Sequence, residues 1–115
     1  MDEAFAVMAQ QKVSAVLYGA TTFFQVIGAR LTALAAQHKI PAVAAGGLMS
    51  YNADRDEVAR QIGNYAAQIL KGATSSDLPV VQSAKFVFTI NLGTAKALGL
   101  AILPALLARA DEVIE

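Results

Sequence analysis

Hydrophobic residues recur along the chain at two spacings, which predict short helices alternating with short strands. Between residues 2 and 12 they recur at helical spacing, and Asp2 and Glu3 suit the amino end of a helix. Residues 13–18, VSAVLY, form a compact apolar run with β-branched members, and Gly19 closes it. Such a run is typical of a buried strand.

The next hydrophobic stripe predicts a longer helix. Thr21 or Thr22 can cap it, and it ends near His38 and Lys39, before a proline. Residues 40–45 then favour a short strand. The apolar face of the helix has members three and four residues apart, namely Phe24, Ile27, Leu31, Leu34 and Ala35.

The glycine pair at residues 46–47 precedes an extended piece at residues 48–51 and then a second amphipathic helix. Asp54, with Glu57 three residues later, is a capping-box pattern, and Gly72 stands where a helix end favours glycine. The apolar face of this helix consists of Val58, Ile62, Tyr65, Ile69 and Leu70.

The C-terminal third begins with residues 86–90, FVFTI, the segment with the strongest strand propensity in the chain. Asn91 or Thr94 then opens a short helix that Gly99 closes. Pro104 suits the first turn of a last helix, which we expect to run from Ala105 to about Val113. Helices that alternate with short buried strands predict an α/β fold with a mainly parallel sheet flanked by helices.

Composition limits the possible classes of protein. The chain has 115 residues, which allows one domain at most, and 56% of them are hydrophobic while only 16% are charged. Because a small domain must expose much of its surface, this excess of apolar residues indicates that some of it contacts a partner. Nine basic and nine acidic residues give zero formal charge, and the basic residues are scattered, so no nucleic-acid footprint is expected.

The histidine and the acidic residues of the chain have simple structural explanations. There is no cysteine and His38 is the single histidine, so we expect no metal site, no cofactor and no catalytic residue. His38 suits a helix C-terminus. The acids fall at predicted helix starts or in a solvated tail, and they are Asp54, Asp56 and Glu57, then Asp111, Glu112 and Glu115.

Two stretches remain as candidate sites. Residues 43–54, VAAGGLMSYNAD, lack the lysine and the spacing of a phosphate loop. Residues 18–24, YGATTFF, follow a predicted strand, and ligands bind at that end of strands in open α/β sheets. Their hydroxyls and aromatic rings suit a small polar ligand with an apolar side, or equally a helix cap with core aromatics.

The chain as written shows no export signal and no membrane span. Its first residues are acidic where a secretory signal would be basic and then apolar. The longest uncharged run, residues 13–29, is interrupted by polar residues and glycines. We therefore expect the chain as written to remain cytoplasmic.

The last fifty residues carry a family resemblance. The segments ILKG, DLPV, INL.TAKALGL and P.LLARADEVIE occur in the order found at the C-terminal end of bacterial ABC-transporter substrate-binding proteins of the tryptophan and tyrosine type. Upstream, AVLYGATTFF, LAAQHKIPAV and GGLMSYNAD also follow the order of that family. The resemblance therefore covers nearly the whole chain.

Proteins of that family are more than twice as long, are exported to the periplasm, and adopt the type I periplasmic binding fold. Two α/β lobes joined by three crossover strands close over a ligand. By resemblance, residues 1–45 and 85–115 belong to the second lobe, and residues 48–72 are a crossover strand and helix that pack on the first lobe. The chain then resembles the C-terminal portion only, a single partial domain, and the apolar face of residues 58–70 is left uncovered.

The resemblance also implies a site. Four residues would line the second-lobe side of the cleft, and they are Tyr18, Thr21, Thr22 and Phe23. Ser50, Tyr51 and Asn52 would line the crossover, and Gly46 and Gly47 would form a hinge. Relatives place an Asp-Pro pair where Ala20 and Thr21 stand, and an acid there would suit an amino-acid ammonium group. Relatives also have a longer segment between Val43 and Gly46.

Several functions follow from this resemblance. The first is a non-catalytic solute-binding component of an ABC importer, which holds a small molecule such as an amino acid between lobes and docks on the membrane permease. The alternatives are an independent cytosolic α/β domain that binds a small molecule or a protein, and a truncated remnant without function. Self-association through the apolar helix face at residues 58–70 is a further expectation.

Overall fold

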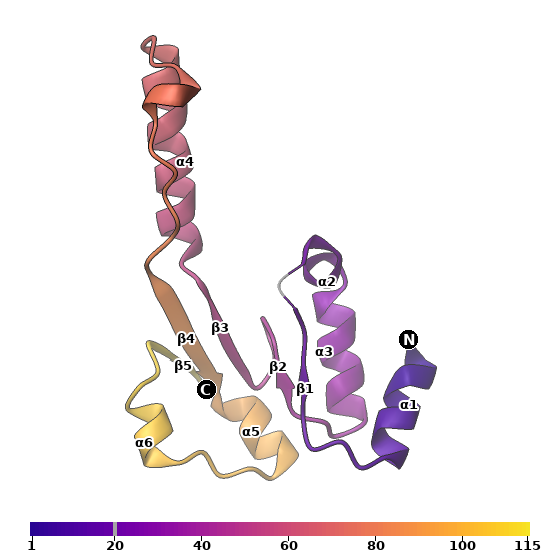
Figure 1. Cartoon of the computed structure of the whole chain (residues 1–115). Coiled ribbons are helices and arrows are strands. Elements are labelled where there is room, and N and C mark those ends of the chain that lie inside the picture. Colours follow the sequence, from indigo (N-terminus) through magenta and orange to yellow (C-terminus); the bar gives the residue numbers. More distant parts are fainter. Residues whose placement is uncertain (20) are drawn as a thin grey trace. The chain divides into compact units, whose positions relative to one another are not determined.

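The computed structural model describes residues 1–19 and 21–115, and its centre is a five-stranded sheet in the order β1-β2-β3-β4-β5 (Figure 1). The strands are β1 (Val16–Leu17), β2 (Ala42–Val43), β3 (Met49–Ala53), β4 (Phe86–Asn91) and β5 (Glu112–Ile114). The helices are α1 (Asp2–Gln10), α2 (Thr22–Val26), α3 (Gly28–Gln37), α4 (Arg55–Leu70), α5 (Leu92–Leu98) and α6 (Pro104–Leu107), with a 3-10 turn at Ser75–Asp77.

The sheet is mainly parallel, as the sequence predicts. β1 pairs with β2, β2 with β3, and β4 with β5 in parallel. Between β3 and β4, Asn91 N donates to Leu48 O at 2.9 Å, and Asp54 N donates to Lys85 O at 3.0 Å. Because the residue number rises along one strand as it falls along the other, β3 and β4 run antiparallel.

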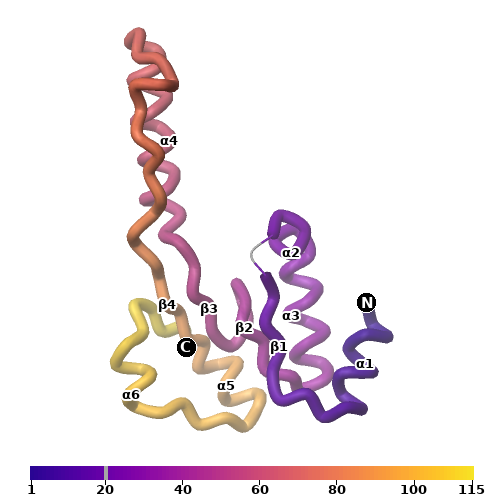
Figure 2. Tube along the Cα trace, viewed as in Figure 1, coloured from indigo at the N-terminus to yellow at the C-terminus, as the bar shows by residue number. Residues whose placement is uncertain are grey.

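The chain forms two compact units. Unit 1 comprises residues 1–51 and 88–115, and unit 2 comprises residues 52–87. The Cα trace leaves unit 1 along β3, continues through α4, and returns along β4 (Figure 2). Each unit is therefore connected to the other by two strands.

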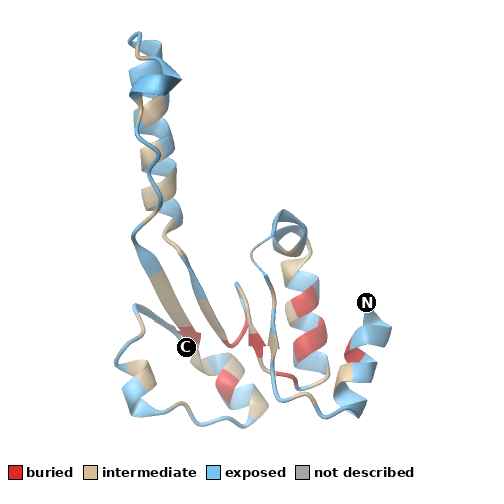
Figure 3. Ribbon diagram, viewed as in Figure 1, coloured by how far each residue is buried: buried red, intermediate tan, exposed pale blue. Residues whose placement is uncertain are grey.

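The core of unit 1 lies between β1, β2 and the helices α1 and α3, where most of the buried residues in Figure 3 are found. The sequence predicts much of this core, since Leu31, Leu34 and Ala35 are buried while Phe24 and Ile27 pack against them. The predicted single helix is interrupted, because Ile27 has φ −96° and ψ 6° and a new helix begins at Gly28. The buried core residues are Phe5, Leu31, Leu34, Ala35, Ile40 and Ala42.

Unit 2 has no buried residue anywhere in residues 52–87, all of which the structure describes (Figure 3). The cap predicted for α4 is present, because Asp54 Oδ1 accepts from Asp56 N at 3.0 Å and from Glu57 N at 3.2 Å. Gly72 follows the helix end with φ +104°, as glycine permits. Three apolar side chains of the predicted face are largely exposed, namely Ile62 at 65%, Ile69 at 51% and Leu70 at 88%.

Two predicted elements are wrong in part. Only Val16 and Leu17 of the predicted buried strand pair with β2, and the Leu17 side chain is 75% exposed. The last helix ends at Leu107, and residues 112–114 of the predicted solvated tail form β5 instead. Asp111 starts this strand, because its N donates to Phe88 O at 2.8 Å and its Oδ2 accepts from Phe88 N at 2.7 Å.

Candidate functional site

The first part of the candidate site lies where β1 leads into α2. Tyr18 follows β1, and its ring stacks on Phe24 with centroids 6.1 Å apart. Its hydroxyl donates to the Leu31 carbonyl oxygen at 3.3 Å, and burial raises the pKa of this phenol. The Tyr18 hydroxyl and ring therefore both contact residues of unit 1.

Thr21 caps α2, which confirms the capping interpretation of this stretch. Its Oγ1 accepts from Phe24 N at 3.4 Å, and its backbone N donates to Gly19 O at 2.9 Å. These bonds fix the turn between β1 and α2, so the Thr21 hydroxyl serves local structure. Ala20, where relatives have an acid by the family resemblance, lies outside the described residues.

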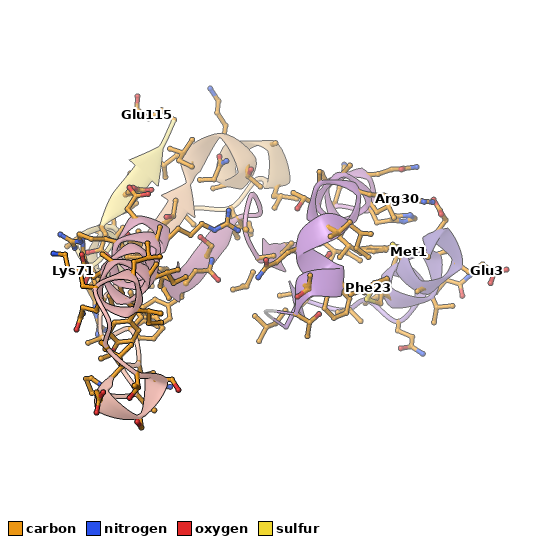
Figure 4. The ribbon with its side chains drawn as sticks, turned by 90° about the horizontal axis from the view of Figure 1, so that it is seen from above. Met1, Glu3, Phe23, Arg30, Lys71 and Glu115 are labelled. Atoms are coloured by element: carbon orange, nitrogen blue, oxygen red, sulfur yellow. The ribbon has the colours of Figure 1, made fainter. Side chains whose placement is uncertain are left out.

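Thr22 and Phe23, like Thr21, are exposed. The Phe23 side chain is 63% exposed, and its ring meets Phe24 edge to face with centroids 5.5 Å apart (Figure 4). A large apolar ring left in water at the start of a helix is a natural surface for an apolar part of a ligand. Arg30 of α3, labelled in Figure 4, joins α3 to α1 through an ion pair in which its Nη2 lies 3.1 Å from Asp2 Oδ2.

The second part of the candidate site lies on β3. Ser50 is half-buried, whereas Tyr51 is 65% exposed and Asn52 is also exposed. Adjacent residues of a strand point to opposite faces, so Ser50 and Asn52 share one face and Tyr51 has the other. Asn52 belongs to unit 2, so it is considered separately from the residues of unit 1.

Strand register brings the unit 1 members to one edge of the sheet. Leu17 pairs with Val43, and Val43 pairs with Met49. Tyr18 comes directly after Leu17 and Ser50 directly after Met49, so these two residues lie at the same level along the strands. Because β2 lies between β1 and β3, the distance between these two strands is about 10 Å. Because these strands are parallel, this is their carboxyl edge, the position that ligands take in open α/β sheets.

The two glycines of the predicted hinge form the turn between β2 and β3. Gly46 has φ +78°, and a Cβ on Gly47 would lie 2.4 Å from Ala42 O. Gly47 N donates to Ala44 O at 2.9 Å, and Leu48 N donates to Ala42 O at 2.8 Å. This short loop joins two parallel strands, which usually need a crossover of a dozen or more residues. Both glycines belong to unit 1, and their hinge role stays a prediction.

Three titratable side chains near helix ends, Asp54, Asp77 and His38, contact other residues of the chain. Lys85 beside Asp54 lowers the pKa of that carboxyl, and hydrogen bonds from Thr74 lower the pKa of Asp77. His38 ends α3 and its ring stacks on Phe5 with centroids 6.1 Å apart. Within residues 1–19 and 21–115, the structure contains no cluster of three histidine, cysteine or acidic side chains that could hold a metal ion.

Sequence reasoning missed the pairing of Asp54 with Lys85. The Asp54 Oδ2 atom lies 2.6 Å from Lys85 Nζ, although the residues are far apart in the sequence. The predicted cap explained Asp54 fully, so nothing suggested a second partner. The signal that could have found it is the antiparallel pairing of β3 with β4, which places these two positions opposite each other.

Known proteins resemble this chain over nearly its whole length. The sequence profile of one family, described as ABC transporter substrate binding protein, matches residues 2–114. No curated protein sequence matches significantly. Of the helices built from the described residues, none has both the length and the apolar character needed to cross a membrane.

Two solved structures share both fold and part of the sequence. One is an ABC domain in complex with L-Trp from Streptococcus pneumonia, with 27% identity and a TM-score of 0.84, and the match covers 98% of this chain and 40% of that one. The other is a conserved domain protein from Vibrio cholerae O1 biovar El Tor, with 25% identity and a TM-score of 0.86, covering 97% of this chain and 40% of that one.

A third solved structure shows the fold alone. It is the ligand-free, open structure of a substrate binding protein with adhesive properties from Clostridium difficile, with 20% identity and a TM-score of 0.65, covering 99% of this chain and 40% of that one. The chain thus spans about 40% of the length of each of these proteins. The match over residues 2–114 confirms the family suggested by the sequence, and the chain belongs to the ABC transporter substrate-binding protein family.

Proposed function

We propose that this chain contributes to the capture of a small-molecule solute for an ABC importer, without catalysing a reaction. The family is one of substrate-binding proteins. The observation that carries the proposal is the strand register, which sets Tyr18 and Ser50 at the same level at the carboxyl edge of the parallel strands β1 to β3. Thr21, Thr22 and Phe23 follow Tyr18 closely in the sequence and would complete the site.

The solute that fits this edge best has an apolar, planar part. Phe23 offers an exposed ring that packs edge to face against Phe24. Thr22, the residue between Phe23 and the cap Thr21, adds a hydroxyl. The relative from Streptococcus pneumonia holds L-Trp, a ligand with a large planar ring. Residues 18–24 contain no carboxylate to pair with an ammonium group, so an aromatic acid or neutral aromatic compound is favoured over a simple amino acid.

The two units would have different parts in this function. By the resemblance, residues 1–45 and 85–115 would belong to the second lobe and residues 48–72 to the crossover, where Ser50 and Asn52 would share the face of β3 that lines the cleft. The exposed face at Ile62, Ile69 and Leu70 would then pack on a further lobe. Gly46 and Gly47 would act as the hinge. The family is typically periplasmic, and the partner of the ligand-bound protein would be an ABC permease.

Ligand binding to the 115-residue chain tests the solute proposal. L-Trp, indole-3-acetate and a panel of L-amino acids would be titrated by calorimetry and by shift of the melting temperature, since a bound ligand stabilises the folded state. A Phe23→Ala variant should weaken binding about two- to tenfold, the value of one aromatic contact. Val26→Ala, which removes another exposed apolar side chain of α2, is the matched control.

Three outcomes would decide against this proposal or in favour of its alternatives. If no compound binds but the chain melts cooperatively, the result would favour the alternative of an independent domain with another partner. A non-cooperative melt with self-association through α4 and no ligand shift would support the remnant without function. Equal effects of Phe23→Ala and Val26→Ala would remove Phe23 from the site.

A further inference from the structure

The two strands that connect the units are joined by side chains as well as by backbone. Asp54 Oδ2 lies 2.6 Å from Lys85 Nζ, and Asp54 N donates to Lys85 O at 3.0 Å. The two residues therefore meet twice, once through a charged pair and once through the ladder. Both belong to unit 2, directly beyond the ends of β3 and β4.

Neighbouring groups hold both residues in this position. The second oxygen of Asp54 accepts from Asp56 N and Glu57 N at the start of α4, so the carboxylate is fixed by the helix. Ser83 Oγ donates to Lys85 O at 3.2 Å, the same carbonyl that receives Asp54 N. The Asp54 side chain is only 15% exposed, whereas that of Lys85 is 68% exposed.

We propose that Asp54 and Lys85 form a clasp that makes the two connecting strands behave as one ribbon. A bend in either strand at the boundary between the units would then have to bend the other. The clasp sits one residue past each strand, where the backbone ladder ends and would otherwise fray. A helix cap alone explains neither the lysine nor the second hydrogen bond to its carbonyl.

Different variants remove the ion pair between Asp54 and Lys85 and the cap that Asp54 provides to α4. Lys85→Met removes the charged pair but leaves every bond from Asp54 to the start of α4 unchanged. Asp54→Asn removes the charge but keeps an amide oxygen that can cap, since asparagine is as good a cap as aspartate. Lys71→Met, which neutralises an exposed lysine just after α4, is the matched control.

Amide hydrogen exchange of the 115-residue chain measures the effect. In Lys85→Met, exchange at the Asp54 amide should become about two- to fivefold faster, as expected for a partly exposed ion pair. The amides of Asp56 and Glu57 should be unchanged, and Ile90, whose side chain is fully buried, is the internal reference. Lys85→Arg, which keeps the positive charge beside Asp54, should retain much of the protection at position 54.

Two results would overturn the clasp. The first is an Asp54 amide that exchanges equally fast in Lys85→Met, Lys71→Met and the parent chain. The second is a uniform acceleration at Asp54, Asp56 and Glu57 in Lys85→Met, which would make the lysine a general support for α4. If Lys85→Met loses structure, Lys85→Gln replaces it, and equal protection of the Asp54 amide in Lys85→Gln and Lys85→Arg counts against the clasp.

Discussion

The Tyr18 hydroxyl donates a hydrogen bond to the Leu31 carbonyl oxygen at 3.3 Å, which joins the end of β1 to the buried side of α3. The same tyrosine ring stacks on Phe24 of α2. One side chain thus links a strand with two helices around the core of unit 1. This arrangement makes Tyr18 a support for the candidate site, because its ring and hydroxyl contact α2, which carries Thr22 and Phe23, and α3.

Removing this hydroxyl tests the support. Tyr18→Phe keeps the stacked ring and deletes one hydrogen bond, so the free energy of unfolding should fall by about 0.5–1.5 kcal/mol. Urea unfolding monitored by circular dichroism measures it. Ligand affinity should change little, because the hydroxyl faces Leu31. A loss of affinity without a loss of stability would instead place the Tyr18 hydroxyl in contact with the ligand.

The turn between β2 and β3 should not accept a side chain at Gly47. A Cβ there would lie 2.4 Å from Ala42 O, so Gly47→Ala must move backbone that pairs both strands. We expect a loss of about 1–3 kcal/mol in the free energy of unfolding. Gly19→Ala is the control, since a Cβ at Gly19 meets nothing within 4 Å. Equal stability of the two variants would mean that this turn is not folded as described.

The opposite result is expected within α4. Gly63 lies in the helix interior and a Cβ there meets nothing within 4 Å, so Gly63→Ala should increase helix stability by about 0.5–1 kcal/mol. Circular dichroism at the helix minimum should show a larger signal at a given temperature. A decreased signal would show that another surface approaches Gly63 closely in solution.

Acid should destabilise unit 2 through its two capping carboxylates. The pKa values of Asp54 and Asp77 are lowered from the ordinary 3.8, mainly by the hydrogen bonds from Lys85 and Thr74. Because the folded state prefers the carboxylates, their contribution is present above about pH 4 and is lost as pH falls through the folded pKa values. Arg60 also favours the charged form of Asp54.

The measurement is the urea midpoint, or the helix signal, as a function of pH. The parent chain should lose stability on acidification, and the double variant Asp54→Asn with Asp77→Asn should lose less over the same range. Arg30→Gln, which removes the exposed pair with Asp2 in unit 1, is the comparison variant. A pH dependence that is identical in the parent and the double variant would contradict this assignment.

Local signals in the sequence were reliable where a single residue type decides the geometry. Thr21, Asp54 and Asn91 cap the helices they were expected to cap, and Gly99 closes α5 with φ +70°. The parallel sheet and the apolar face of α3 followed from periodicity. In these cases the physical cause acts within a few residues, so the sequence contains it.

Pairing between distant segments could not be obtained in this way. The segment at residues 112–114 has charged neighbours that suggest a solvated tail, yet it forms β5 because β4 offers an open edge and Asp111 bonds to Phe88. For the candidate site, sequence order placed Tyr18 and Phe23 together. The strand register that sets Ser50 level with Tyr18 emerged only from the fold.

The lack of any buried side chain in residues 52–87 has a consequence for how the protein can be followed in solution. A helix the length of α4 is marginal in water without packing. Its helical signal will therefore report whether another surface covers Ile62, Ile69 and Leu70, while the core around Phe5 and Leu31 reports only on unit 1. The circular dichroism signal of α4 can therefore report whether unit 2 has bound another surface, and no added label is needed.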